Sequence, residues 1–380
     1  MRPKRSLYRH DYAMIIASDG KVCYLSFMSR NDSKATAART RPVTLADIGR
    51  EAGVSFSIVS RVLRNREDRI PEATRNKVWK AAEVLGYRRN LLIRGVQTGR
   101  SMNIGVVIPS TGSYYSEIVH GIHDEFRKHE YCIVLAWNSE EMAGPDSKQE
   151  LDLIHSLVDR RVDGIILRPT HADVSNVYFS EVLQRNIPMV TVDRPLPGVT
   201  CDFSGTDDER GACLATRHLL EAGHRRLVHV AVASSFEPAR LRRAGFEMEC
   251  AAVKGTTFST IQIKGYDETG LVISEVDKVL RRKDRPTALF LASDNLAPWV
   301  YRTARRVGLK IPDDLSVVGF GNTEVGEWLE PRLTSIDQSP RQMGENAARM
   351  IIDRIRKDGG EVTRILSNPA LVERDSVARR

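Results

Sequence analysis

Residues 43–63 read VTLADIGREAGVSFSIVSRVL, and this stretch decides how the first part of the chain folds. Its apolar residues recur at helical spacing on either side of Gly53: Leu45, Ile48 and Ala52 precede it, and Val59, Val62 and Leu63 follow it. Because Gly53 interrupts the first helix and Ser55 can cap a second one, the stretch predicts a helix-turn-helix. The second helix of that motif fits the DNA major groove, and its exposed positions here carry no acidic residue. We therefore expect a module that reads DNA.

The basic residues of the chain are concentrated around this motif. The 380 residues carry a net charge of +8. Residues 1–100 hold 21 Lys and Arg against 9 Asp and Glu, a balance of +12, whereas the remaining 280 hold 36 against 40, a balance of −4. A basic head on a slightly acidic body is typical of a polyanion-binding module joined to a domain of another kind.

Three segments can be distinguished before residue 102. Residues 1–41 are polar and basic without a clear period, so we expect a disordered extension. Met28 is a second candidate for the initiator, in which case residues 1–27 do not belong to the native protein. Residues 42–88 form the DNA-binding domain, because a third helix begins near Pro71 and ends at Gly86. Residues 89–101 connect this domain to the rest of the chain.

From residue 102 onward, short apolar runs alternate with helical segments. The runs cover residues 104–108, 132–136, 164–167, 188–192, 227–230, 261–263, 288–291 and 316–320. Continuous apolar strands that alternate with helices predict an α/β core of parallel sheets covered on both faces. The pattern is too long for one sheet of ordinary size, and the loop at about 194–208 separates two Rossmann-like lobes. Ligands of such sheets bind at the carboxyl ends of the strands, here in the cleft between the lobes.

Several other classes of protein are not expected. The five cysteines lie far apart without a C-x-x-C pair, which indicates reduced thiols in the cytoplasm and neither disulfides nor a metal site. No apolar run approaches the ~20 residues needed to cross a membrane. Gly319-Phe320-Gly321 follows a strand, but Glu324 stands where a dinucleotide fingerprint needs its third glycine. No Walker motif, G-x-S-x-G or metal-spaced His pair is found, so neither an enzyme nor a bound cofactor is expected.

A set of short motifs follows one order along the chain: Ser60-Arg61-Val62-Leu63, Gly86-Tyr87, Arg161-Val162-Asp163-Gly164, Val192-Asp193-Arg194-Pro195, Arg243-Ala244-Gly245-Phe246 and Ile311-Pro312-Asp313-Asp314-Leu315. From residue 43 almost to its end, the chain therefore resembles the LacI/GalR family of bacterial transcription regulators. The resemblance implies a homodimer on a pseudo-palindromic double-stranded DNA operator, with a small effector bound in a two-lobed, periplasmic-binding-protein-like core.

The resemblance also implies that the chain crosses between the lobes three times. Residues 102–203 and 335–362 are then expected in the first lobe, and residues 204–334 and 363–380 in the second. A sugar-binding transport protein with the same two-lobed core is the alternative. Such a protein would carry a signal peptide and no DNA-binding head, whereas we expect a DNA-binding head and no signal peptide in this sequence.

The resemblance identifies residues of the second helix that would read bases. Phe56, Ser57 and Arg61 match the base-reading positions of the family. Arg61 can donate two hydrogen bonds to guanine, a contact worth ~1–3 kcal/mol of discrimination. Two alternatives remain: Phe56 packs on a thymine methyl or completes the small core, and Arg61 reads a base or touches only phosphate.

Hydroxyls and a hinge, which the resemblance implies over residues 89–101, would add further DNA contacts. Thr44, Ser55 and Ser60 lie near helix N-termini and suit phosphate, although Ser55 would cap its helix in any protein. Asn90 matches a family motif at the start of the hinge. Val96 replaces the leucine that wedges into the minor groove in the family, and this shorter wedge predicts a shallower DNA bend.

The resemblance also identifies residues that would contact the effector. Tyr114 and Tyr115 match a loop whose aromatic faces stack on a sugar ring or a base, although Tyr115 alternatively caps the following helix. Arg242 matches a cleft arginine that donates to ligand hydroxyls or a carboxylate. Four further residues follow strands at the cleft: Asp193, Arg194, Ser293 and Asp294.

Two positions qualify the nature of the effector. Gly321 stands where the family commonly has an Asp that accepts hydrogen bonds from ligand hydroxyls. The loss of that acceptor, together with Arg194 and Arg242, favours a sugar acid or phosphosugar over a neutral sugar. Trp328 falls where the family often supplies an aromatic wall, with an exposed interface as the alternative.

Overall fold

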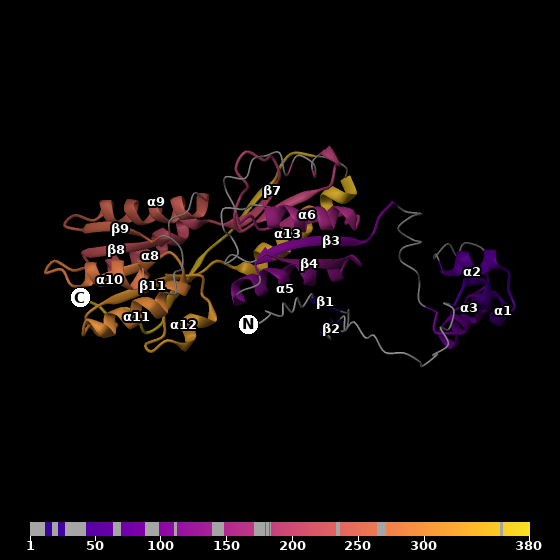
Figure 1. The fold of residues 1–380 in the computed structure, drawn as a ribbon, viewed down its shortest axis with the longest axis horizontal. Coiled ribbons are helices and arrows are strands. Elements are labelled where there is room, and N and C mark those ends of the chain that lie inside the picture. The colour runs from indigo at the N-terminus through magenta and orange to yellow at the C-terminus, as the bar shows by residue number, and fades with distance from the viewer. Residues whose placement is uncertain are drawn as a thin grey trace, which may run out of the picture. The chain divides into compact units, whose positions relative to one another are not determined.

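The computed structural model describes residues 12–16, 22–26, 43–63, 70–87, 99–109, 112–138, 148–170, 179, 182, 184–232, 236–263, 271–357 and 360–380. Its contacts divide the chain into two units. One unit contains the helices between residues 45 and 84, and the other contains residues 102–380 (Figure 1).

The first unit contains a three-helix domain. Its helices are α1 (Leu45–Ala52), α2 (Phe56–Leu63) and α3 (Glu72–Val84), as the sequence predicts. They bury a common core: Ile48, Val59, Val62, Leu63, Val78, Ala81 and Ala82. Gly53 ends α1 in the left-handed conformation, with φ +65°. Gly49 permits the tight turn, because a Cβ there would lie 2.8 Å from the carbonyl oxygen of Val54.

The N-terminal extension departs from the expectation of disorder over residues 1–41. Strands β1 (Tyr12–Ile16) and β2 (Val22–Ser26) pair in a two-stranded sheet. Both segments are apolar runs rich in strand-forming residues, and Asp19-Gly20 between them is a dipeptide that favours hairpin turns. The prediction weighed the basic residues and overlooked this pattern. The rest of residues 1–41 lies outside the described residues.

The first lobe of the second unit is built on a six-stranded sheet. Its order is β13-β7-β6-β5-β3-β4, and every pairing is parallel. The strands are β3 (Asn103–Pro109), β4 (Cys132–Asn138), β5 (Gly164–Leu167), β6 (Met189–Val192), β7 (Asp202–Thr206) and β13 (Arg364–Ser367). Helices α5 (Ser113–Arg127) and α13 (Pro340–Lys357) cover one face, and α6 (Lys148–Asp159) covers the other.

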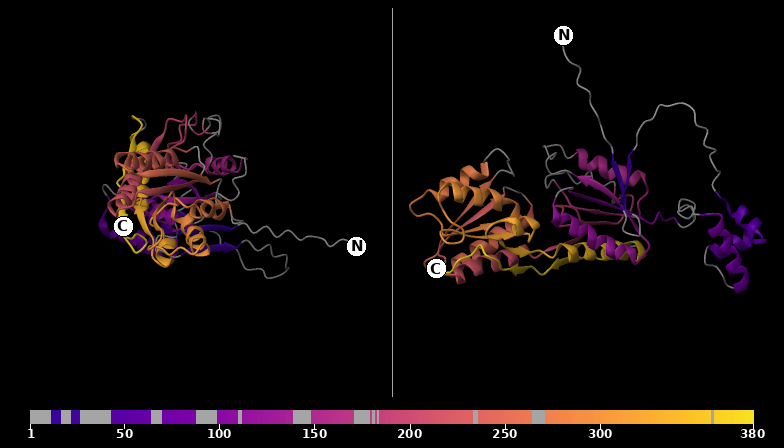
Figure 2. Two further views of the ribbon diagram at one scale, coloured as in Figure 1. Left: turned by 90° about the vertical axis from the view of Figure 1, so that its left-hand side faces the viewer. Right: turned by 90° about the horizontal axis from the view of Figure 1, so that it is seen from below.

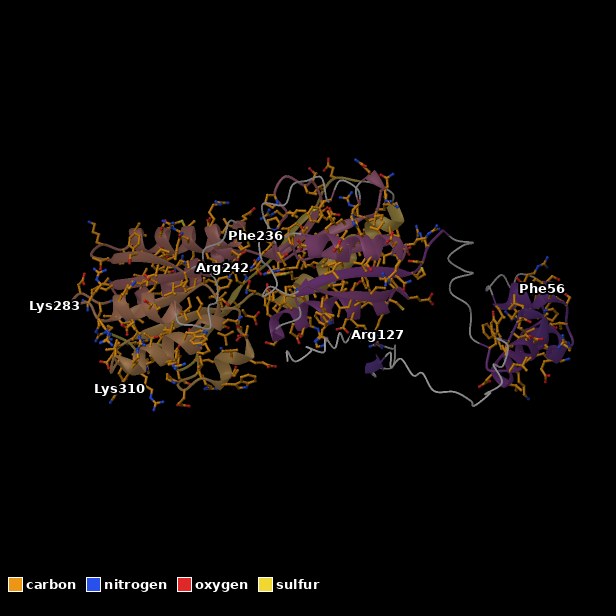
Figure 3. The ribbon with its side chains drawn as sticks, viewed as in Figure 1. Phe56, Arg127, Phe236, Arg242, Lys283 and Lys310 are labelled. Carbon is orange, nitrogen blue, oxygen red and sulfur yellow. The ribbon has the colours of Figure 1, made fainter. Side chains whose placement is uncertain are left out.

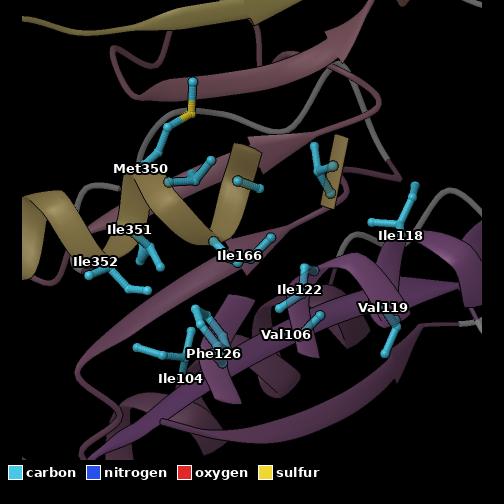
Figure 4. Close-up of a cluster of buried hydrophobic side chains, with 14 of the residues drawn as sticks. Ile104, Val106, Ile118, Val119, Ile122, Phe126, Ile166, Met350, Ile351 and Ile352 are labelled. Atoms are coloured by element: carbon cyan, nitrogen blue, oxygen red, sulfur yellow. The ribbon is translucent and has the colours of Figure 1, made fainter. Parts of the chain in front are cut away.

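The pair α5 and α13 forms the larger part of this lobe's core. Apolar side chains of both helices pack on β3, β5 and β6, as Figure 4 shows for Ile122, Phe126 and Ile351. The helix backbones touch at two glycines. A Cβ on Gly121 would overlap the carbonyl of Arg341, and a Cβ on Gly344 would overlap the carbonyl of Ile118.

The second lobe repeats the arrangement. Its sheet has the order β14-β12-β11-β10-β8-β9, parallel except for the edge strand β14. The strands are β8 (Arg226–Val232), β9 (Thr257–Ile263), β10 (Ala288–Leu291), β11 (Ser316–Phe320), β12 (Thr334–Asp337) and β14 (Ala370–Val372). Helices α8 (Asp208–Glu221) and α9 (Glu237–Ala252) pack on one face, and α10 (Leu271–Leu280) and α11 (Ala297–Arg306) on the other (Figure 2).

Three segments of chain connect the lobes: β7 to α8, β12 to α13, and β13 to β14. Three strands lie wholly or partly in a different lobe from the one that the expected ranges gave them. Residues 204–206 of β7 and all of β13 belong to the first sheet, where β13 pairs with β7 over residues 364–367. Similarly, β12 (334–337) belongs to the second sheet. Each strand runs to its end within one sheet, and the connections therefore lie three to five residues further along the chain than expected.

Candidate functional site

Helix α2 presents a surface suited to a major groove. Phe56 is 59 % exposed (Figure 3), Ser57 and Arg61 are exposed, and Ser60 is half-buried. The apolar residues Val59 and Val62 face the core instead, because they recur at helical spacing. Of the two alternatives for Phe56, the structure therefore excludes the one in which its ring completes the core. The role of this surface in DNA recognition stays a prediction.

Two of the hydroxyls expected at DNA phosphates cap helices. The Thr44 hydroxyl accepts from the Asp47 backbone N–H at 3.4 Å, and the Asp47 carboxylate accepts from the Thr44 backbone N–H at 2.9 Å, which makes a capping box on α1. The Thr44 hydroxyl also donates to the Asp47 carboxylate at 2.6 Å. The Ser55 hydroxyl accepts from the Ile58 N–H at 3.4 Å. Accepting from a backbone N–H leaves the Ser55 proton for a phosphate, whereas the Thr44 proton is already donated to Asp47. Asn90 and Val96 lie outside the described residues.

A cavity of about 410 Å³ lies between the two lobes, at the carboxyl ends of the strands. Its volume is in the range of small-molecule sites. The first lobe contributes the N-terminus of α5 and the residues that follow β5 and β6. The second lobe contributes the first turns of α9 and the residues at the ends of β10 and β11. Figure 3 shows Phe236 and Arg242 on the side of the second lobe that faces the first.

Asp193 is the centre of a charged network in the first lobe. Its carboxylate accepts from Tyr114 Oη at 2.8 Å and from Arg168 Nε at 3.1 Å, and it lies 3.8 Å from Arg194 Nε. Burial alone would raise the pKa of Asp193, but Arg168 and Arg194 more than offset this, and the pKa is lowered. Burial, reinforced by Asp193, raises the pKa of Tyr114 well above its usual value. The carboxylate is therefore charged, and the phenol keeps its proton.

Arg242 occupies the matching position in the second lobe. Its guanidinium donates to Asp208 at 2.7 Å, to the carbonyl of Ala292 at 2.7 Å and to Gln338 Oε1 at 3.1 Å. Its central carbon lies 3.9 Å from the centre of the Phe320 ring. Burial would lower the pKa of Arg242, but Asp208 more than offsets this and raises it. These contacts hold the guanidinium in one orientation at the cavity wall.

The cavity brings together eight of the nine residues expected to contact an effector: Tyr114, Tyr115, Asp193, Arg194, Arg242, Ser293, Gly321 and Trp328. Tyr115 packs edge-on against Tyr114, with 5.2 Å between ring centres. Trp328, the last residue of the short helix α12 (Glu324–Trp328), is 76 % exposed at the rim. Gly321 has φ +137°, a conformation that residues with a side chain rarely adopt.

Asp294, the ninth, does not face the cavity. It is fully buried at the start of the short 3₁₀ segment η1 (Asp294–Leu296), where its carboxylate accepts from the Ser335 hydroxyl and the Thr323 N–H, each at 2.7 Å. Burial raises the pKa of Asp294. The prediction was wrong because position alone cannot tell which of two polar residues after a strand turns inward. Here Ser293 lines the cavity, and Asp294 fixes the loop after β11.

Arg168, Gln338 and Phe236 are among the lining residues that the sequence analysis missed. Arg168 follows β5 directly, so the rule that ligands bind at strand carboxyl ends could have found it. Gln338 lies in the second connection between the lobes, and its Oε1 is 3.3 Å from Tyr114 Oη and 3.1 Å from Arg242. Phe236 packs under the guanidinium of Arg194, 4.7 Å from its central carbon. Neither of the last two carries a local signal in the sequence.

Comparisons with known proteins agree with this architecture. A family model described as bacterial regulatory proteins, lacI family, matches residues 44–90, and a periplasmic binding protein-like domain matches residues 216–377. Among the described residues, no helix combines the length and apolarity required to cross a bilayer.

Relatives match over nearly their whole length. The HTH-type transcriptional repressor PurR of Vibrio atlanticus (strain LGP32) is 30% identical over 88% of this chain and 98% of its own. Catabolite control protein A of Priestia megaterium is 30% identical over 83% of this chain and 93% of its own. The structure of the lac repressor dimer bound to operator and the anti-inducer ONPF matches with a TM-score of 0.76 and 25% identity, over 89% of this chain and all of that one. The CelR–cellobiose complex matches with a TM-score of 0.64 and 27% identity, over 88% of this chain and all of that one. The chain therefore belongs to the lacI family of bacterial regulatory proteins, which are DNA-binding regulators of transcription.

Proposed function

We propose that this protein is a repressor that binds a pseudo-palindromic DNA operator as a homodimer, and that a small sugar-like effector in the interlobe cavity controls its affinity for DNA. The observation that carries the proposal is the exposed face of α2, which presents Phe56, Ser57 and Arg61 and has no acidic residue in its first turn. A helix of this composition can enter the major groove without repulsion from phosphates.

The relatives support the two remaining parts of the proposal. The lac repressor structure is a dimer on its operator, and the CelR structure holds cellobiose. In this chain, the cavity combines aromatic rings from both lobes with fixed polar groups, which is the composition expected of a site for a small polar ring. The effector acts on DNA affinity to the extent that it binds one arrangement of the lobes more tightly than another.

An in vitro selection from random duplex DNA with the full chain tests the proposal. We expect a two-fold-symmetric site of two adjacent half-sites, bound by two chains in sedimentation experiments. Arg61→Ala should lose ~1–3 kcal/mol of discrimination at one base pair in each half-site. Arg50→Ala is the matched control: Arg50 lies on α1, is 78% exposed and pairs with Asp47, so its loss should leave the selected sequence unchanged.

The proposal fails if the selection returns no symmetric sequence and binding is only non-specific and steeply dependent on salt. It also fails in part if the operator is bound by a single chain. Repeating the binding measurement with pools of small metabolites then identifies the effector by the change in operator affinity.

A further inference from the structure

The wall of the effector cavity is rich in positive charge. Arg168, Arg194 and Arg242 all line it. Among the described residues of the inner wall, two carboxylates face these three guanidinium groups: Asp193 lies against Arg168 and Arg194, and Asp208 against Arg242. Glu324 is exposed at the rim, where water screens its charge. Arg168 and Arg194 share the carboxylate of Asp193, so the first lobe's part of the wall has two guanidinium groups around one carboxylate.

Two acceptors of the inner wall are engaged by its own donors. Asp193 accepts from Tyr114 and Arg168, and the side-chain oxygen of Gln338 accepts from Arg242. Gly321 has no side chain that could accept a hydrogen bond. A carboxylate at this position is disfavoured for two reasons: φ is +137°, and Asp294 Oδ2 lies 3.4 Å from where a Cβ would be. A sugar hydroxyl both donates and accepts, whereas a carboxylate or phosphate only accepts, so a wall whose acceptors are engaged favours an oxyanion over a neutral sugar.

The N-terminus of α5 adds to this field. Gly112, Ser113 and Tyr114 lie in the cavity wall at the start of this 15-residue helix. The first turn of α5 has no acidic residue, and no side chain caps it. Its backbone N–H groups and the positive end of its dipole therefore face the cavity. Helix N-termini of this kind bind anionic groups.

We propose that the effector is a small organic oxyanion, a sugar acid or a sugar phosphate, whose charged group lies between the N-terminus of α5 and Arg194. This inference deepens the proposed function and rests on it. Arg194 is 27% exposed, and Phe236 beneath its guanidinium holds it at the cavity. The exposed face of Trp328 and the ring of Tyr115 are placed to receive the rest of the ligand.

Binding of matched probes to the full chain tests the inference. Glucose, gluconate and glucose 6-phosphate form one set, and galactose and galacturonate another, each measured by calorimetry and thermal shift at constant ionic strength. We expect at least one charged member to bind roughly tenfold or more tightly than its neutral partner, as a charge-assisted contact implies. The carboxylate and phosphate members then distinguish the two kinds of oxyanion. Equal or tighter binding of the neutral sugars, or no protection by any anion of the sets, overturns the inference.

Two variants locate the charged group. Arg194→Gln should weaken the anion by roughly tenfold or more while leaving a neutral sugar unaffected. Ser113→Asp should weaken the anion similarly without lowering the melting temperature of the free protein, because an acidic residue in the first turn favours the helix. Arg243→Gln, on the exposed side of α9 and paired with Glu247, is the matched control and should change neither. Unchanged anion binding in both cavity variants refutes the placement.

The operator selection on the same preparation separates the two proposals. If the operator is bound and only neutral sugars alter its affinity, the anion inference is wrong and the regulator remains. If no operator is bound, the proposed function is wrong whichever small molecules bind the cavity.

Discussion

The contact between α5 and α13 makes one prediction that can be worked through in numbers. Gly344→Ala places a methyl group on the carbonyl of Ile118, with the Ile118 carbonyl carbon 2.9 Å away and the Ile122 nitrogen 3.0 Å away. These neighbours are backbone atoms of a helix whose other face is packed on the sheet. They cannot swing aside as a flexible side chain would, so the two helices have to separate.

The expected change in stability is the difference between two effects. Alanine is favoured over glycine in a helix by about 1 kcal/mol. Overpacking of a well-packed contact costs about 1–3 kcal/mol, and a clash between two backbones lies at the upper end. We therefore expect Gly344→Ala to lower the free energy of unfolding by about 2 kcal/mol, which corresponds to a drop of roughly 4–8 °C in melting temperature for a lobe of this size.

Urea unfolding followed by circular dichroism measures this difference, provided that the dependence on urea is unchanged. Gly326→Ala is the matched control. Gly326 is also helical and buried, but the nearest atom to a Cβ there is Leu333 Cβ at 3.4 Å, an ordinary contact. The control should be neutral or stabilising. A Gly344→Ala protein within 0.5 kcal/mol of the wild type would refute the reasoning.

Three further predictions concern other parts of the molecule. Asp202→Ala should lower the free energy of unfolding by about 3–5 kcal/mol, because Arg354 donates to both oxygens of this buried carboxylate, at 2.6 and 2.8 Å, and would keep only the carbonyls of Gly360 and Glu361 and no opposite charge; a loss below 1 kcal/mol in urea unfolding speaks against it. Burial lowers the pKa of His229 to about 4, so the unfolded chain takes up this proton first and stability falls as the pH drops from 6.5 towards 4. By pH 5 the loss is about 2 kcal/mol, and His229→Phe should remove that part of the pH dependence; an unchanged slope contradicts this. Phe56→Ala should weaken operator binding in a gel-shift assay without lowering the melting temperature, since its ring is 59 % exposed, and a clearly lowered melting temperature would assign the ring to the core instead.

Much of the fold could be predicted because its signals are local. The break at Gly53 and the helical spacing of Val59 and Val62 identify the helix-turn-helix without any knowledge of distant contacts. The buried strands of the core read as continuous apolar runs, since parallel strands are covered on both faces. Strand β13 was assigned to the wrong lobe because its lobe depends on pairing with β7, more than 150 residues earlier in the chain.

The sequence could predict only those residues of the site that follow a strand directly or match a position of the family. Tyr114, Asp193 and Arg242 lie at the cavity as expected. Gln338 was missed because it lies in a connection between the lobes, and no sequence pattern indicates that this connection passes beside the cavity. Asp294 was misplaced because its inward turn depends on Ser335 and the backbone of Thr323, which come from later in the chain.

The threefold passage between the lobes has a consequence for how this protein is made. Five of the six strands of the first sheet are complete by Thr206, but α13, which covers one of its faces with Met343, Ala347 and Ile351, ends about 150 residues later. At the usual speed of synthesis, the ribosome needs roughly 8–30 s to add that stretch. During this interval the apolar face of β3, β5 and β6 has no permanent cover from α13. If synthesis ends before residue 340, the chain is released without α13 and its first lobe cannot bury its core. Such truncated chains should be degraded rather than accumulate as folded fragments.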